Sequence, residues 1–232
     1  CYTECEKEIR GMELNRYIEH TLLKQDAAKA DFEKLFKEAR DNKFFGVCVN
    51  PAYVKMAREA LRGTDVKIVT VVGFPLGANK TEIKAAETAL ALKDGADEID
   101  MVLNVTELKN KNYDYISDEV AALKKVCGEH NLKVIIETDL LTKDEIVKAC
   151  ELCVKGGADF VKTSTGFVKG GVGAKVEDVK VMYETVSPHG LRVKASGGIK
   201  TKESALALIE AGAVRLGTSS GVNIVMSCST RV

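Results

Sequence analysis

Three features of the 232-residue sequence predict an α/β fold, a single-domain TIM barrel of the (β/α)8 type. Short apolar runs alternate with longer amphipathic runs along the chain, as strands alternate with helices in such folds. Several of the short runs are apolar on both faces, which is typical of a sheet covered by helices. Eight such units in roughly 230 residues lie near the lower size limit of this barrel. A doubly wound open sheet is the main alternative.

Strands are expected where apolar and β-branched residues cluster between turn residues. The two-faced apolar character is clearest in residues 68–72 (Ile-Val-Thr-Val-Val) and 134–136 (Val-Ile-Ile). In chain order, the expected strands cover residues 17–21, 45–49, 67–72, 98–103, 133–137, 160–163, 191–195 and 214–217.

Helices are expected between the strands, where apolar residues recur at spacings of three and four, as Ala205, Leu208 and Ile209 do. A glycine and an alanine follow several of them, and the glycine suits the residue just beyond a helix end. Because no linker or charge block interrupts the pattern, residues 1–232 are interpreted as one domain, with residues 1–14 as an N-terminal extension or helix. The expected helices cover residues 28–42, 51–61, 81–94, 116–130, 143–155, 176–186 and 202–211.

Composition and charge argue against several classes of partner. Lys plus Arg and Asp plus Glu both number 34, so no charge excess favours nucleic acid or an anionic membrane surface. No apolar run reaches the roughly 18 residues that a membrane span needs. The charged segment 1–8 lacks the apolar core of a signal peptide, and the expectation is a soluble, intracellular protein.

The cysteines and histidines indicate neither disulfides nor a metal site. Seven scattered cysteines are interpreted as thiols. Cys150 and Cys153 have redox-like spacing, but they fall late in an expected helix, so packing is favoured over redox chemistry. The three histidines form no ligand pattern with cysteines or acids, so we expect no metal and no cofactor.

Two lysines stand at the ends of consecutive expected strands. Lys162 follows Phe160 and Val161, and Lys194 follows Val193. Burial disfavours the charged form of a lysine, and the neutral amine is the form that attacks carbonyl groups to make a Schiff base. Neighbouring strands are about 5 Å apart, so a cation at Lys194 would oppose protonation of Lys162. The alternative is that both side chains only extend to solvent from a strand end.

One carboxylate is placed to work with these lysines. Asp100 lies between the apolar residues Ile99 and Met101 in an expected strand. It could orient a lysine or transfer a proton through water, and the alternative is a structural ion pair. Asp97 and Glu98 are interpreted as surface residues at the start of the same strand.

Glycine-rich turns follow the seventh and eighth expected strands, where TIM barrels often bind phosphate through backbone N–H groups. Thr165 and Gly166, after the sixth strand, are expected to complete this cradle. Thr21 and Cys48, near the ends of the first two strands, are further candidates for substrate contact, although buried packing is favoured for Cys48. The candidates in the two turns are Gly197, Gly198, Lys200, Gly217, Ser219 and Ser220.

With these motifs in place, the chain from about Tyr17 to Gly221 resembles the deoxyribose-phosphate aldolase family. The segments Lys162-Thr163-Ser164-Thr165-Gly166 and Lys194-Ala195-Ser196-Gly197-Gly198 carry most of the resemblance. The other matching segments are His20-Thr21-Leu22-Leu23-Lys24, Val47-Cys48-Val49-Asn50-Pro51, Gly73-Phe74-Pro75-Leu76-Gly77, Gly95-Ala96-Asp97-Glu98-Ile99-Asp100-Met101-Val102 and Gly217-Thr218-Ser219-Ser220-Gly221.

The resemblance implies a metal-free class I aldolase that reversibly cleaves 2-deoxy-D-ribose 5-phosphate to D-glyceraldehyde 3-phosphate and acetaldehyde. Lys162 would form the Schiff base, and Asp100 with Lys194 would transfer protons and tune the amine. The resemblance also implies a cytoplasmic homodimer that acts in deoxyribose phosphate catabolism. Two alternatives remain open: a Schiff-base aldolase or transaldolase for another sugar phosphate, and a barrel that binds metabolites without cleaving them.

Three positions depart from the family pattern. Glu19 stands where aspartate is more common, and Lys200 stands where arginine is common, which gives a point charge in place of a bidentate fork. Asp139 adds an acid where a small neutral residue is expected, and we expect its side chain to point away from the barrel mouth.

Overall fold

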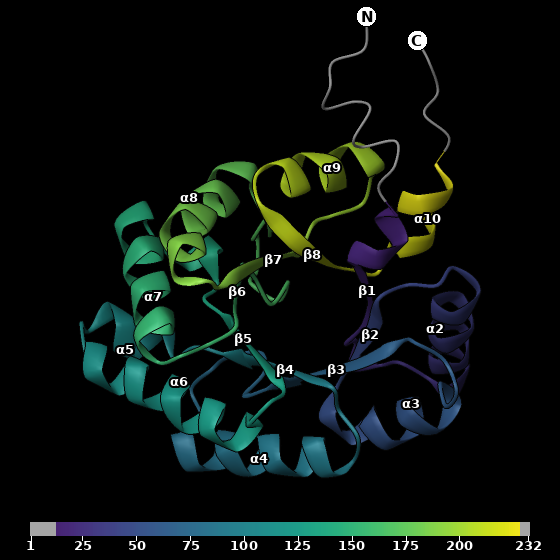
Figure 1. The fold of residues 1–232 in the computed structure, drawn as a ribbon, viewed down its shortest axis with the longest axis horizontal. Helices are drawn as coiled ribbons and strands as arrows, with labels where there is room; N and C mark the ends of the chain where they lie inside the picture. Colours follow the sequence, from purple (N-terminus) through teal and green to yellow (C-terminus); the bar gives the residue numbers. More distant parts are fainter. Residues whose placement is uncertain (1–12, 228–232) are drawn as a thin grey trace, which may run out of the picture.

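The computed structural model describes residues 13–227 and contains a closed barrel of eight parallel strands in sequence order. Each strand pairs with the next one along the chain, and β1 (Ile18–Leu22) pairs with β8 (Ala213–Thr218) to close the barrel. Helices surround the strands on the outside (Figure 1). The prediction of a TIM barrel is therefore confirmed, and the alternative of a doubly wound open sheet is excluded. Of the expected N-terminal extension, residues 1–12 lie outside the described residues.

The strands lie where the sequence predicted them, with shifts of a few residues at their ends. The shift is clearest in β5, which ends at Ile135 because Glu137 takes a left-handed backbone conformation with φ 60°. The six strands between β1 and β8 are β2 (Gly46–Val49), β3 (Lys67–Val72), β4 (Glu98–Val102), β5 (Asn131–Ile135), β6 (Phe160–Lys162) and β7 (Arg192–Ser196).

The helices alternate with the strands as predicted, and two short ones were missed. The missed helices, α5 (Val105–Lys109) and α10 (Gly221–Met226), are too short to show a helical period. The other α-helices are α2 (Lys29–Asp41), α3 (Val54–Ala60), α4 (Thr81–Lys93), α6 (Tyr113–Cys127), α7 (Lys143–Lys155), α8 (Val176–Val186) and α9 (Lys202–Glu210). Short 3-10 helices cover Leu14–Tyr17 (η1), Pro51–Tyr53 (η2), Thr138–Leu140 (η3) and Ser187–His189 (η4). None of the helices described is long and apolar enough to cross a membrane.

Helix ends follow local sequence signals. At α7, the Thr142 hydroxyl accepts a hydrogen bond from the Glu145 backbone N–H at 3.3 Å, and the Glu145 carboxylate accepts one from the Thr142 N–H at 2.8 Å. This reciprocal pair forms a capping box, which satisfies two backbone donors that the first helical turn cannot use. The helix therefore begins at a defined residue and holds the loop after β5 in place.

The apolar core lies between the strands and the surrounding helices, whereas charged side chains fill much of the barrel interior. Strand residues alternate between these two environments. On β4, Ile99 and Met101 belong to the apolar core, and Glu98 and Asp100 join the charged interior. Because buried charges must pair with each other, the interior is fixed by ion pairs as much as by packing.

A buried ion pair also fastens α4 to α6, outside the barrel. The Lys84 Nζ lies 2.9 Å from the Glu119 Oε2 and donates to the Val102 carbonyl oxygen at 2.9 Å. Burial lowers the pKa of Lys84 and raises the pKa of Glu119, and each partner only partly opposes the shift of the other. Each side chain therefore depends on the other for its charge partner.

We expect Lys84→Met to destabilise the fold by about 3 kcal/mol, because it leaves the Glu119 carboxylate buried without its partner. The double variant Lys84→Met/Glu119→Gln should recover part of this loss, since no uncompensated charge remains. Urea unfolding followed by circular dichroism measures both values. A double variant as unstable as the single one would show that packing, not charge, determines the cost.

Candidate active site

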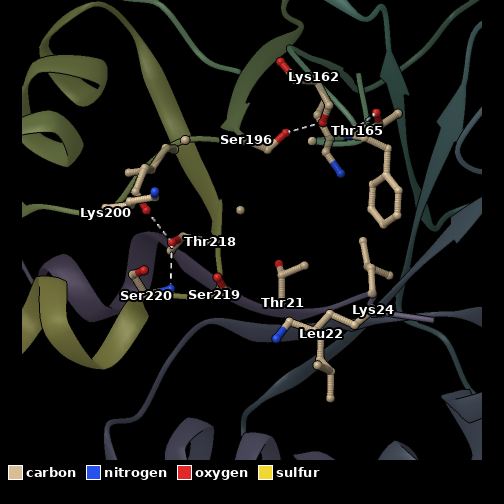
Figure 2. Close-up of a pocket in the computed structure, with 18 residues that line it drawn as sticks. Thr21, Leu22, Lys24, Lys162, Thr165, Ser196, Lys200, Thr218, Ser219 and Ser220 are labelled. Carbon is tan, nitrogen blue, oxygen red and sulfur yellow. Dashed lines mark hydrogen bonds between the residues drawn. The ribbon is translucent and has the colours of Figure 1, made fainter. Parts of the chain in front are cut away.

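A cavity of about 370 Å³ opens at the carboxyl ends of the strands, at the end of the barrel where TIM-barrel active sites lie. The ends of β1, β6, β7 and β8 and the turns after them line it (Figure 2). Ten of the expected site residues contribute to this lining: Thr21, Lys162, Thr165, Gly166, Gly197, Gly198, Lys200, Gly217, Ser219 and Ser220.

Lys162 carries its amine into this cavity from the last position of β6. Its Nζ lies 2.7 Å from the Asp100 Oδ2, and the Lys194 Nζ lies 2.7 Å from the same oxygen. The strand register explains the arrangement, because Lys162 and Lys194 occupy paired positions on β6 and β7. Asp100 and Lys194 are fully buried and do not line the cavity. One carboxylate oxygen beneath the cavity thus joins the two lysines that the sequence singled out.

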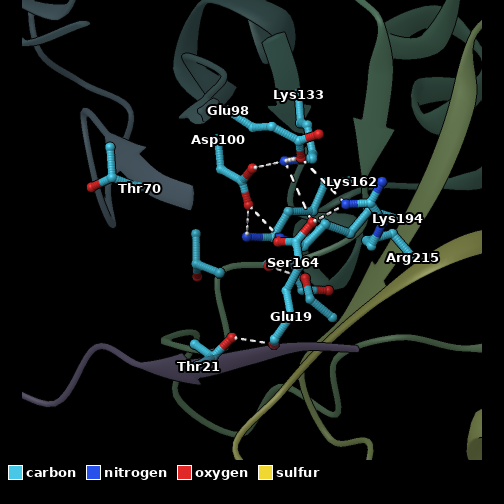
Figure 3. Close-up of polar contacts among 12 residues, drawn as sticks. Glu19, Thr21, Thr70, Glu98, Asp100, Lys133, Lys162, Ser164, Lys194 and Arg215 are labelled. Atoms are coloured by element: carbon cyan, nitrogen blue, oxygen red, sulfur yellow. Dashed lines mark hydrogen bonds and ion pairs between the residues drawn. The ribbon is translucent and has the colours of Figure 1, made fainter. Parts of the chain in front are cut away.

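Two further cations, Lys133 and Arg215, belong to this cluster and were missed by the sequence analysis (Figure 3). The Lys133 Nζ lies 3.0 Å from the Asp100 Oδ1, and the Arg215 Nη1 lies 3.1 Å from the Glu19 Oε1. A signal was present: Lys133 is a single charge between Leu132 and Val134, as Asp100 is between two apolar residues. The register places Lys133 beside Asp100, and Arg215 beside Lys194.

Glu19 and Glu98 supply the other carboxylates of the cluster. Glu19 accepts a hydrogen bond from Lys194 and lies 3.5 Å from the Lys133 Nζ. The expectation of a surface position for Glu98 is wrong, since its side chain is only 6% exposed and lies 2.5 Å from the Lys133 Nζ. Asp97, the residue before Glu98, is half-buried, and its Oδ2 lies 2.7 Å from the Arg58 Nη2.

These contacts set the charge states around Asp100. Burial opposes ionisation of Asp100, but the fields of Lys133, Lys162 and Lys194 outweigh it and hold its pKa well below the usual range. Burial also disfavours the charged form of Lys194, yet Asp100 and Glu19 raise its pKa overall. The pKa of Lys133 is likewise raised, because the carboxylates outweigh burial. Asp100 is therefore an anion and Lys133 and Lys194 are cations at neutral pH.

The turns after β6, β7 and β8 are tied together by short side chains. The Ser196 hydroxyl donates to the Ser164 carbonyl oxygen at 2.6 Å, and the Thr218 hydroxyl donates to the Ile199 carbonyl oxygen at 2.7 Å. Gly198 has φ 74°, and a Cβ there would lie 2.2 Å from the Val172 oxygen. These turns therefore form a fixed rim of backbone, with the exposed Lys200 beside it.

Ser164 is a cavity residue that the sequence analysis did not assign separately. It is 1% exposed, and its hydroxyl has no hydrogen-bond partner among the residues that the structure describes. Because a buried hydroxyl without a partner is costly, a water molecule or a ligand oxygen would satisfy it. The hydroxyl is two residues from Lys162 and belongs to the same cavity lining.

Asp139 does not line the cavity. Its Oδ2 accepts a hydrogen bond from the Gly173 N–H at 2.8 Å, and its Oδ1 lies 3.4 Å from the Lys175 Nζ. Nearby, the Glu137 carboxylate accepts hydrogen bonds from the Thr165 hydroxyl and backbone N–H. Burial raises the pKa of Glu137. Both acids thus hold the segment after β6.

Cys48 does not line the cavity. It is 1% exposed and packs with Leu23, Val69 and Val71. Burial raises the pKa of the Cys48 thiol to about 11, which leaves almost no thiolate at neutral pH. Within residues 13–227, no three His, Cys, Asp or Glu side chains are grouped so that they could hold a metal ion.

Comparisons with known proteins agree on one family. A sequence model of the DeoC/LacD family of aldolases matches residues 17–227. A deoxyribose-phosphate aldolase of Streptococcus uberis is 54% identical over 214 residues, which cover 92% of this chain and 96% of the relative. One of Finegoldia magna is 55% identical over 214 residues, which cover 92% and 99%. The solved structure of a deoxyribose phosphate aldolase from Aeropyrum pernix, described as a unique tetramer, matches with a TM-score of 0.87 and 30% identity, over 95% of this chain and 94% of that one.

We expect the four described cysteines to resist alkylation by iodoacetamide near neutral pH in the native protein. Burial raises the pKa of Cys48 and Cys127 to about 11 and that of Cys150 to about 12, and it also raises the pKa of Cys153 well above its usual value. Because the thiolate is the reactive form, labelling should become fast only after unfolding in urea. Peptide mass spectrometry on native and unfolded samples measures this. Rapid labelling of native Cys48 would contradict the buried assignment.

Proposed function

The chain belongs to the DeoC/LacD family of aldolases, and on that premise we propose that it is a class I deoxyribose-phosphate aldolase. The observation that carries the proposal is the Asp100 Oδ2, which lies 2.7 Å from the amines of both Lys162 and Lys194. A nucleophilic amine needs a polar partner to orient it and a nearby cation to disfavour its protonation. Asp100 and Lys194 supply these two functions at the floor of the cavity.

In the proposed reaction, the Lys162 amine attacks the aldehyde carbon of open-chain 2-deoxyribose 5-phosphate. Loss of water gives a cationic iminium, which Asp100 stabilises by charge. The 3-hydroxyl then loses its proton, the bond between C2 and C3 breaks, and glyceraldehyde 3-phosphate leaves. The electron pair of that bond remains on C2 as an enamine bound to Lys162. Protonation at C2 and hydrolysis release acetaldehyde and restore the amine.

Proton transfer in these steps is assigned to Asp100 and Lys194 with a water molecule. Because its pKa is low, Asp100 binds a proton only weakly, so it would pass a proton on rather than keep it. Lys194, whose raised pKa keeps it a cation, would hold and polarise the water that returns a proton to the enamine. Neither role needs a metal ion or an organic cofactor, because the lysine itself supplies the electron sink.

The rim of the cavity suits the phosphate group of the substrate. Backbone N–H groups in glycine-rich turns bind phosphate well, and TIM barrels often use the turns after β7 and β8 for this purpose. Gly166, Gly197, Gly198, Gly217, Ser219 and Ser220 would provide this cradle, with Lys200 as the cation. Thr21, Thr165 and Ser164, whose hydroxyl has no partner among the described residues, line the same cavity and would bind the sugar hydroxyls.

We assign Cys48 a packing role beneath the site, since it does not line the cavity. The wider assignment, a cytoplasmic homodimer in deoxyribose phosphate catabolism, follows from the family resemblance. Light scattering on purified protein tests the dimer, and a tetramer, as described for the Aeropyrum pernix relative, would contradict it.

We expect Lys162→Met to lower kcat/KM for 2-deoxyribose 5-phosphate by roughly 10³-fold or more, because the nucleophile is lost. Asp100→Asn should lower it by roughly 10²- to 10⁴-fold. In wild-type protein, reduction with borohydride in the presence of acetaldehyde should add an ethyl group to Lys162, as measured by peptide mass spectrometry. An adduct on a different residue, or full activity of Lys162→Met, would disprove the mechanism.

A substrate panel measured with EDTA present separates this proposal from the related possibilities. Faster cleavage of another sugar phosphate with the same Lys162 adduct would reassign the substrate. Phosphate binding without turnover or adduct would indicate a binding protein.

We expect Lys200→Ala to raise KM by about 3- to 10-fold and to change kcat little, because an exposed cation stabilises bound phosphate equally in ground and transition states. The effect should shrink at high salt. Lys169→Ala is the matched control, since Lys169 is exposed near the mouth but does not line the cavity. Equal effects of the two substitutions would indicate general electrostatic attraction rather than a phosphate site.

A further inference from the structure

Three members of the charged interior have no part in the proposed reaction. Lys133, Glu98 and Arg215 are buried, do not line the cavity, and do not contact the Asp100 Oδ2 that Lys162 and Lys194 share. Lys133 nevertheless contacts Asp100 and Glu19, Arg215 contacts Glu19, and Glu98 pairs with both Lys133 and Arg215. Lys133 bridges the two carboxylates of β4, at 2.5 Å from the Glu98 Oε2 and 3.0 Å from the Asp100 Oδ1. Figure 3 shows Lys133 and Glu98 close to Asp100, and the Lys133 Nζ also lies 3.5 Å from the Glu19 Oε1.

The cluster has one more cationic side chain than it has carboxylates. Lys133, Lys162, Lys194 and Arg215 are in contact with Glu19, Glu98 and Asp100. An uncompensated charge is expensive in a buried site. The cluster becomes neutral when one of the four cations loses its proton, and arginine does not do so in proteins.

The contacts indicate which lysine gives up the proton. Lys133 touches three carboxylates, those of Glu98, Asp100 and Glu19. Lys194 touches two, Glu19 and Asp100. Within the described residues Lys162 has an ion pair only with Asp100, through an oxygen that Lys194 also occupies. As a cation Lys162 is therefore the least compensated of the three, and its amine opens to the cavity.

We propose that Lys133 and Glu98 are positioning residues that set the protonation of Lys162 by fixing the charge excess of the barrel interior. This inference rests on the proposed function, in which Lys162 must be a free amine. Lys133 also fixes the Asp100 Oδ1, which leaves the Oδ2 to the two catalytic lysines. Besides Asp100 on β4, the charge of Lys162 acts on Cys48 on β2 and on Glu137 after β5; Glu137 hydrogen-bonds to Thr165 and makes no ion pair among the described residues. The other charged groups belong to the cluster around Asp100: Glu19 on β1, Glu98 on β4, Lys133 on β5, Lys194 on β7 and Arg215 on β8, whereas β3 presents Val69 and Val71.

Two substitutions that do not touch the substrate should shift the pH dependence in opposite directions. Lys133→Met leaves three cations facing three carboxylates, so Lys162 should keep its proton to a higher pH. Glu98→Gln leaves four cations facing two carboxylates, so Lys162 should lose its proton at a lower pH. We expect the acidic limb of the pH profile to move up by at least about one pH unit in the first variant and down by a similar amount in the second. The double variant Lys133→Met/Glu98→Gln has three cations and two carboxylates, the same excess of one cation as the wild type. It should return the acidic limb of the pH profile toward the wild-type position.

The readout is the rate at which acetaldehyde is trapped on Lys162 by cyanoborohydride as a function of pH, followed by mass spectrometry. The profile of kcat/KM against pH for 2-deoxyribose 5-phosphate provides a second measurement. The matched control is Lys84→Met/Glu119→Gln, which removes an equally buried ion pair outside the barrel. This control should alter stability without moving the limb. If Lys133→Met does not fold, the downward shift in Glu98→Gln carries the test alone.

Suppose that acetaldehyde is trapped on Lys162, but the acidic limb of the pH profile stays in place or moves in the same direction in both single variants. This result would overturn the inference and leave the proposed function intact. Absence of any adduct on Lys162 in the wild-type protein would instead overturn the proposed function. A shift of the limb in the control variant would show that general loss of stability, and not the interior charge, moves the profile.

Discussion

The burial of the Asp100 carboxylate is the constraint on which the rest of the site depends. A carboxylate without contact with water must be compensated by several donors, and three lysines from β5, β6 and β7 provide this compensation. Each of those lysines is in turn buried and needs its own anions, which brings in Glu19 and Glu98. The network of ion pairs therefore extends across the barrel from one buried charge. It meets the cavity at Lys162.

The cavity rim depends on backbone constraints of a different kind. The turns after β6, β7 and β8 are held by hydrogen bonds from serine and threonine side chains, and Gly198 allows the backbone to approach the segment after β6. Asp139 and Glu137 fix that segment from the loop after β5. In the proposed function, this rigid rim and the Lys162 amine would hold a phosphate and a carbonyl at a set separation. Such preorganisation is what an aldolase needs to hold its substrate for attack.

Much of this could be predicted from local sequence, because local patterns report periodicity and strand ends. Apolar runs predict the eight strands, and a single charge within or at the end of such a run predicts Lys162, Lys194 and Asp100. Glu98 was misplaced because its environment depends on Lys133 on another strand, and a local pattern does not show which strands pair. Arg215 was missed for the same reason, since it meets Glu19 only because the last strand closes the barrel against the first. The helices α5 and α10 were missed because five or six residues do not complete two turns.

The seam between β8 and β1 has a consequence for how the protein is made. Glu19 lies on the first strand to be synthesised, and its partner Arg215 follows 196 residues later on the last. Until β8 has left the ribosome, a nascent barrel holds Glu19 without this partner and has no closing strand to shield its charges from water. The interior charge balance is thus completed only when β8 joins the sheet and closes the barrel.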